Sequence, residues 1–124
     1  MIDSSQLMSD LLVLPHADYT SIGERGVNLS GGQKARVSVA RALYAGAKCG
    51  AGSGVGSECD LYIFDDPLAS VDVHVGKALF THALTSPVLQ GKARVLVLSS
   101  NYHLLPLFDK VCIYVFVCKH VRFP

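Results

Sequence analysis

The sequence lacks a surplus of charge of either sign. Only 17% of its 124 residues are charged, and its formal net charge is +1. A dedicated nucleic-acid-binding domain carries a basic face, so this class is excluded and we expect no nucleic-acid partner. Because half of the residues are apolar, the chain differs from a disordered tail. With 124 residues, it is long enough for one domain with its own core.

Three kinds of segment are also missing. No apolar run reaches the roughly 20 residues that span a bilayer, and the start has neither the basic flank nor the apolar core of a signal peptide. The four cysteines, Cys49, Cys59, Cys112 and Cys118, show no C-x-x-C spacing, which argues against a zinc site and favours reduced thiols. A bridge between Cys49 and Cys59, which bracket a loop, stays open at this stage.

The Gly/Ser-rich segment 48–59 does not match a phosphate-binding loop. It lacks the Lys of the pattern G-x-x-x-x-G-K-[ST], and Val55 or Ser57 stands where the third glycine of G-x-G-x-x-G belongs. No predicted strand precedes it. We interpret the segment as a surface insertion.

What the chain does have is a helix start rich in N–H donors, Leu29–Gln33 (LSGGQ). Ser30 and Gln33 have the spacing of a capping box, in which each side chain bonds the backbone N–H of the other. Gly31 and Gly32 leave their N–H groups open to an anion at the positive end of the helix dipole. Taken alone, the motif is equally well explained as a capped helix or as an anion site.

Hydrophobic periodicity predicts the remaining elements. A short helix, capped by Ser4 or Ser5, ends at Pro15. The helix that starts after Ser30 runs to about residue 47, and its apolar residues form two stripes, so both sides should be covered. The first stripe is Ala35, Val39, Ala42, Leu43 and Gly46, and the second is Val37, Ala40 and Tyr44. Unalternating apolar runs predict strands buried on both faces at 61–64, 94–99 and 111–117, with a helix over 73–84 and a turn or short helix around 104–107. This order predicts an α/β fold with a mostly parallel sheet and flanking helices.

Polar side chains follow two of the predicted strands. Asp65 and Asp66 come at the end of the first, and 99–101 (SSN) at the end of the second. In open α/β sheets, ligands bind at the carboxyl ends of the strands. Asp72 is placed to cap the helix that follows.

Together, these features resemble the nucleotide-binding domain of ATP-binding cassette (ABC) transporters. Leu29–Gln33 matches the signature motif of that family, 61–65 resembles its Walker B strand, and 69–72 resembles its D-loop. Segments 22–26 and 65–68 look most like the multidrug-resistance-associated (C) subfamily. Asp66 stands where most members have Glu, which is typical of the first of the two nucleotide-binding domains.

The resemblance runs from about residue 7 to residue 113 and implies part of a P-loop NTPase (ABC ATPase) fold. A helical-subdomain remnant and the signature helix would occupy 1–47, and the insertion would occupy 48–59. The Walker B, D-loop and switch part of the core would occupy 60–124.

The resemblance also implies roles for the strand-end residues. Asp65 would hold Mg²⁺ through water, although by itself it could also be a plain strand-end acid. Asp66 occupies the general-base position with a side chain one methylene shorter than Glu. Ser100 takes the place of the switch histidine that touches the γ-phosphate, but its hydroxyl carries no positive charge. The hydrolytic positions are therefore degenerate. His103 is the nearest histidine that would be able to replace the switch histidine, but it stands three positions beyond the place expected for it.

In the signature motif, Ser30 and Gly32 would contact the γ-phosphate of an ATP molecule held by a partner domain. Gly31 belongs to the same binding motif, and Gln33 supports the helix start. Asp72 would communicate across the dimer interface, a role that is compatible with capping.

The resemblance therefore predicts part of an ATP-binding, ATP-hydrolysing domain of an ABC-type exporter that couples hydrolysis to transmembrane transport, with ATP and Mg²⁺ as cofactors. Its partners would be a second nucleotide-binding domain, in a head-to-tail dimer, and the transmembrane domains of the transporter, at the cytoplasmic face of a membrane. The family's Walker A motif, adenine-stacking loop and Q-loop have no match here, so we expect a truncated domain that by itself neither binds ATP tightly nor hydrolyses it.

Two alternatives remain. In the first, the chain would be a non-catalytic module that presents its signature to a partner domain's ATP. In the second, it would be a truncated product without a separate function, whose unpaired apolar strands would aggregate. Chromosome-maintenance and repair ATPases have a similar signature but carry long coiled coils around it, and no heptads are found here.

Overall fold

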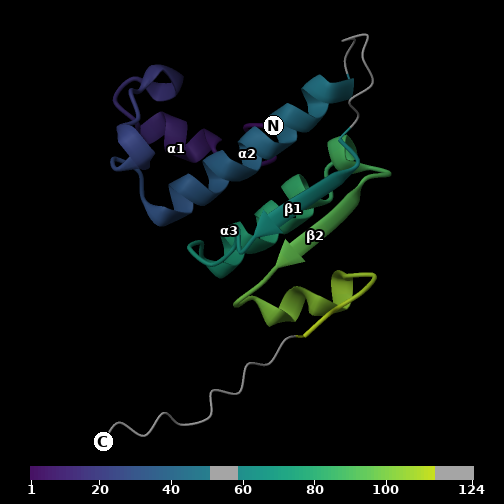
Figure 1. Cartoon of the computed structure of the whole chain (residues 1–124). Helices are drawn as coiled ribbons and strands as arrows, with labels where there is room; N and C mark the ends of the chain where they lie inside the picture. Colours follow the sequence, from purple (N-terminus) through teal and green to yellow (C-terminus); the bar gives the residue numbers. More distant parts are fainter. Residues whose placement is uncertain (51–58, 114–124) are drawn as a thin grey trace, which may run out of the picture.

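A long helix packed against two parallel strands forms the centre of the molecule (Figure 1). The computed structural model describes residues 1–50 and 59–113, so most of the predicted insertion lies outside the described residues. The helices and strands are α1 (Met8–Val13), α2 (Gly31–Gly50), β1 (Leu61–Asp65), α3 (Val73–Leu79) and β2 (Ala93–Val97). Short 3-10 segments lie at Ala17–Tyr19, Glu24–Gly26, Pro87–Leu89 and Tyr102–Leu107, and a π-helical turn, Phe80–Leu84, continues α3.

The two strands pair in parallel, in a register that runs from Leu61 opposite Ala93 to Asp65 opposite Val97. A parallel pair needs a crossover connection, which α3 and the segments after it provide. The predicted parallel α/β arrangement is thus confirmed for these two strands. Because both strands end at the same edge of the sheet, Asp65 lies close to the residues that follow Val97.

The prediction that both faces of these strands are buried is wrong. Along β1, Tyr62 and Phe64 are buried, whereas Leu61 is exposed and Ile63 is 66% exposed. Val95 of β2 is exposed as well. Among the described residues, the helices cover one face of the sheet, and successive side chains of a strand point to opposite faces.

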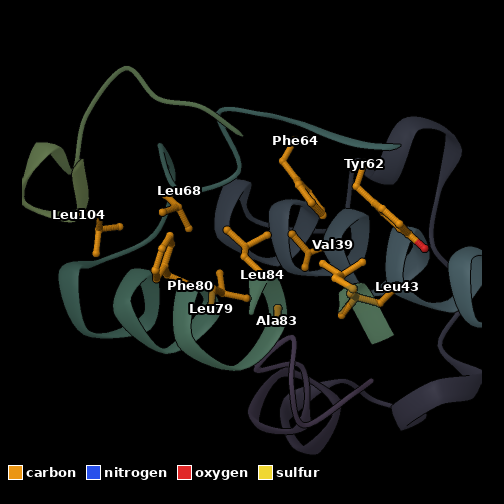
Figure 2. Packing of buried hydrophobic residues seen from close by; sticks show 11 residues of the cluster. Val39, Leu43, Tyr62, Phe64, Leu68, Leu79, Phe80, Ala83, Leu84 and Leu104 are labelled. Carbon is orange, nitrogen blue, oxygen red and sulfur yellow. The ribbon is translucent and has the colours of Figure 1, made fainter. Parts of the chain in front are cut away.

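The core lies between β1 and the helices (Figure 2). Tyr62 and Phe64 lie over Val39 and Leu43 of α2, and their rings stack with centroids 6.3 Å apart. The rest of the buried cluster comes from the turn after β1, from α3 and its π-turn, and from later segments: Leu68, Leu79, Phe80, Ala83, Leu84, Leu89 and Leu104. This packing fixes the end of β1 relative to α2.

The two apolar stripes predicted for α2 differ in how well they are covered. Val39 and Leu43 of the first stripe are buried. In the second stripe, Val37 and Ala40 are half-buried and Tyr44 is exposed. The prediction of a helix covered on both sides is therefore confirmed for one side and incomplete for the other.

The predicted helix before Pro15 is confirmed as α1, but its predicted cap is wrong. Leu7 is the N-cap residue, and no side chain caps the first turn. Ser5 is buried instead, and its hydroxyl donates to the carbonyl of Ile2 (3.0 Å). The Ser5 hydroxyl thus has its hydrogen-bond partner in the turn before α1 and does not cap the helix.

An ion pair joins α1 to α2. The carboxylate of Asp10 accepts from Nε (2.6 Å) and Nη2 (2.8 Å) of Arg36. The two side chains are only 11% and 14% exposed, respectively. In Figure 1, α1 lies on the side of α2 that faces away from β1, so this pair anchors the N-terminal segment.

The third predicted strand is not found in the described residues. Residues 111–113 are in neither helix nor strand, and 114–117 lie outside the part that the structure describes. Cys59 and Cys112 are free, which confirms the predicted thiols for these two residues and leaves Cys59 without a bridge to Cys49. In the described ranges, no helix is both long enough and apolar enough to cross a bilayer.

Candidate functional site

The predicted capping box forms at the start of α2. The Ser30 hydroxyl accepts from the N–H of Gln33 (3.2 Å), and the Gln33 side-chain oxygen accepts from the N–H of Ser30 (2.9 Å). The N–H groups of Gly31 and Gly32 have no intrahelical acceptor and lie at the positive end of the helix dipole. The helix start is therefore ordered and still able to donate to an anion.

The same helix start is approached closely by Ser70. A Cβ at Gly31 would lie 3.1 Å from the Cβ of Ser70, and a Cβ at Gly32 would lie 2.9 Å from the carbonyl oxygen of Ser70. Position 32 thus requires glycine, because a backbone oxygen cannot turn aside as a flexible side chain can. The two glycines let the turn after β1 pack against α2, a reason that the sequence did not indicate.

β1 ends at Asp65, which is exposed, and the chain then turns at Asp66. Asp66 has a φ of 44°, in the left-handed region that Asp and Asn adopt more readily than most residues. Its N–H donates to the carbonyl of Val97 (3.1 Å). Its carboxylate accepts from both the N–H (3.2 Å) and the hydroxyl of Ser99.

Ser100, at the predicted switch position, has a different partner from Ser99. It is half-buried, and its hydroxyl oxygen accepts from the side-chain amide of Asn101 (3.1 Å). The same amide nitrogen donates to the carbonyl of Leu68 (3.2 Å). The structure thus brings the two polar strand ends together, and it pairs Asp66 with Ser99, a contact that sequence reasoning missed.

Asp72 caps α3, as predicted. One carboxylate oxygen accepts from the N–H groups of Val75 (3.0 Å) and His74 (2.9 Å). The hydrogen bond from Val75, followed by the bond from His74, favours the charged form and lowers the pKa of Asp72 below its ordinary value of 3.8. The D-loop role of Asp72 stays a prediction.

The donor set limits which metal fits at the strand ends. In the part of the chain that the structure describes, no three His, Cys, Asp or Glu side chains gather around one point. Mg²⁺ held mainly by phosphate oxygens and water needs one or two protein carboxylates, so the exposed Asp65 fits such an ion. His103 is exposed in Tyr102–Leu107 and joins no such group.

These observations define a class of protein. The chain is an α/β protein with polar side chains at the carboxyl edge of a parallel strand pair and an open helix start packed against the turn that leaves this edge. In α/β proteins, ligands bind at this edge, and open helix N-termini bind phosphate groups.

Comparison with known proteins shows which proteins the chain is similar to. No family model matches the chain. The chain is 44% identical over 113 residues to ABC transporter C family member 8 of Dictyostelium discoideum. It is 44% identical over 114 residues to ATP-binding cassette sub-family C member 2 of Mus musculus, and 42% identical over 113 residues to sub-family C member 3 of Homo sapiens. The chain is therefore a homologue of a segment of the C-family ABC transporters, as its motifs predicted.

The matches differ in how much of each protein they cover. They extend over 90–91% of this chain but over only 6% of each of these three relatives. The chain thus spans about 6% of the length of the relatives it matches.

Proposed function

We propose that the chain is part of an ATP-binding and ATP-hydrolysing domain, the first of two, in a C-family ABC exporter that couples hydrolysis to transmembrane transport. The start of α2 carries this proposal: its capping box is intact, and its two glycine N–H groups are able to donate to an anion. The names of the relatives, which include "ATP-binding cassette", support ATP as the nucleotide.

ATP would be held mainly by a partner domain, and α2 of this chain would complete that site. Ser30 and Gly32 would contact the γ-phosphate, and Gly31 would add a further backbone N–H. Gln33 would keep the helix start in place through its bond to Ser30. Asp72 would transmit changes at the interface to α3, which it caps.

The chain's own strand-end site would be the weaker of the two sites. Asp65 would hold Mg²⁺ through water. Asp66 is shorter than Glu, and its two oxygens already accept from Ser99, so its reach to an attacking water is reduced. Ser100 would supply one neutral hydrogen bond where a histidine would be able to supply charge. Hydrolysis would therefore occur mainly in the site that α2 completes.

A signature that faces ATP on another domain requires a partner, so we infer a head-to-tail dimer with a second nucleotide-binding domain. The transmembrane domains of the parent transporter would be the other partners. The domain would then lie at the cytoplasmic face of the membrane. With a net charge of +1, the chain offers nucleic acid no electrostatic attraction.

Two substitutions at Ser30 test the phosphate contact. Asn and Asp both serve as N-caps as well as Ser does, but Asp places a negative charge where the phosphate would approach. We expect Ser30→Asn to keep ATP-dependent association with an intact C-family nucleotide-binding domain, and Ser30→Asp to weaken it by at least about tenfold. Isothermal titration calorimetry with the full chain measures both, and equal affinities of the two variants would contradict the contact.

A second candidate function is a non-catalytic module that presents its signature to the ATP of a partner. The contrast between the intact start of α2 and the Asp and Ser at positions 66 and 100 favours it. Turnover separates the two candidates: association that raises the partner's ATP hydrolysis supports the first, and association without such a rise supports the second. If ATP drives no association, the chain has no separate function of either kind.

A further inference from the structure

The turn between β1 and α3 touches two elements that are far apart in the sequence. The carbonyl of Leu68, in this turn, accepts a hydrogen bond (3.2 Å) from the side-chain amide of Asn101, which follows β2. Ser70, also in this turn, lies against Gly31 and Gly32 of α2, close enough to exclude a side chain at position 32. The turn therefore stands between the end of β2 and the start of α2.

The turn itself is firmly held, so a displacement at Leu68 reaches Ser70. The Leu68 side chain is buried in the core, and the N–H of Ala69 donates to the carbonyl of Asp66 (3.2 Å). At the other end, Asp72 caps α3. Only one residue, Ala69, separates the Leu68 carbonyl, which Asn101 binds, from the Ser70 carbonyl, which lies over Gly32.

Asn101 is held in a conformation that directs its amide to this turn. Its φ is 59°, in the left-handed region, and it stands at the N-cap of Tyr102–Leu107. The amide nitrogen donates to Ser100 as well as to Leu68.

We propose that Asn101 is a positioning residue: its side-chain amide holds turn 66–72 against the start of α2 and thereby sets the direction of the N–H groups of Gly31 and Gly32. What these groups bind rests on the proposed function. The mechanical link from Asn101 to the two glycines does not, and it is tested without nucleotide.

The test compares amide spectra of the ¹⁵N-labelled full chain with those of three variants. Asn101→Gly keeps the left-handed backbone but removes the amide, and Asn101→Asp keeps the size but puts an oxygen where the donor was. Tyr102→Phe is the matched control, because it removes a neighbouring hydrogen bond in which no residue of the turn takes part, from the Tyr102 hydroxyl to the carbonyl of Ser99 (2.6 Å).

Both Asn101 variants should shift the Gly31 and Gly32 resonances and raise hydrogen exchange at Ala69 about fivefold, the effect of losing one hydrogen bond. Tyr102→Phe should do neither. Unchanged glycine resonances in Asn101→Gly, or equal changes in Tyr102→Phe, would overturn the link, and Asn101→Asp decides the matter if Asn101→Gly unfolds. If the glycines shift but Ser30→Asp still binds like Ser30→Asn, the positioning role stands and only the phosphate contact fails.

Discussion

Gly46 shows how much a single missing side chain matters in α2. The ring of Tyr62 lies over it, so that a Cβ at position 46 would come within 2.6 Å of Tyr62 Cζ and closer still to the hydroxyl oxygen. Glycine inside a helix costs up to about 1 kcal/mol relative to Ala. Here, glycine allows α2 and β1 to approach each other. The sequence placed Gly46 in the apolar stripe, but only the fold shows that an aromatic ring covers it.

We therefore expect Gly46→Ala to lower the free energy of unfolding by about 1–3 kcal/mol, because overpacking outweighs the gain in helix propensity. The matched control is Gly76→Ala in α3, where a Cβ would find its nearest neighbours at 3.6 and 3.7 Å. This control should raise the free energy of unfolding by about 0.5–1 kcal/mol. Urea unfolding followed by circular dichroism measures both, and destabilisation of the same size in each would contradict the role of Tyr62.

At the scale of elements, the ion pair between Asp10 and Arg36 attaches α1 to α2. It joins residues 26 positions apart, and both side chains are largely shielded from water. Hydrophobic periodicity detects apolar faces, so it gives no indication of this pair. The Arg36 guanidinium also lies 3.4 Å from the position that a Cβ of Gly32 would take, so the pair adjoins the start of α2.

Replacing Asp10 with Asn should cost about 2 kcal/mol locally, because it leaves the Arg36 charge without its bidentate partner. The loss should appear as faster hydrogen exchange in α1, with β1 and α3 unchanged. Asp60→Asn is the control: Asp60 is 83% exposed and pairs with Lys92 at 3.4 Å, so its loss should change stability by less than about 0.5 kcal/mol. Exchange that rises equally in α1 and β1 would show that the pair supports the whole core.

At the scale of the whole molecule, one face of the sheet stands out because it is apolar and exposed. Leu61, Ile63, Val95 and Val97 all point away from the core cluster. Exposed apolar surface of this kind favours association with other surfaces. Within the described residues, the core cluster lies on the other face only, so the predicted two-sided burial fails.

Neighbouring positions on β1 test this arrangement. Ile63→Thr keeps β propensity but makes the exposed face more polar, so it should reduce self-association while changing the free energy of unfolding by less than about 0.5 kcal/mol. Phe64 points into the core, so Phe64→Thr should destabilise the chain by about 3–5 kcal/mol. Sedimentation velocity and urea unfolding measure the two effects. Unchanged self-association in Ile63→Thr would show that this face does not drive it.

Much of the candidate site could be predicted because its contacts are local. The bonds between Ser30 and Gln33 and the Asp72 cap join residues two or three positions apart, so spacing alone indicates them. The pairing of Asp66 with Ser99 could not be predicted in this way, because it depends on the register between β1 and β2. The strand expected at 111–117 rested on an apolar run alone, and residues 111–113 are not in a strand.

The sequence by itself therefore determined features that depend on neighbouring residues: the caps of α2 and α3, the approximate positions of the helices and of β1 and β2, and motif patterns that resemble those of C-family ABC transporters. The tertiary structure alone decided which face of each element is covered and which distant polar groups meet. The approach of Ser70 to Gly32 and the bond from Asn101 to Leu68 belong to this second group. Such contacts form only when strand register and helix packing bring distant segments within a few ångströms, and no local spacing encodes them.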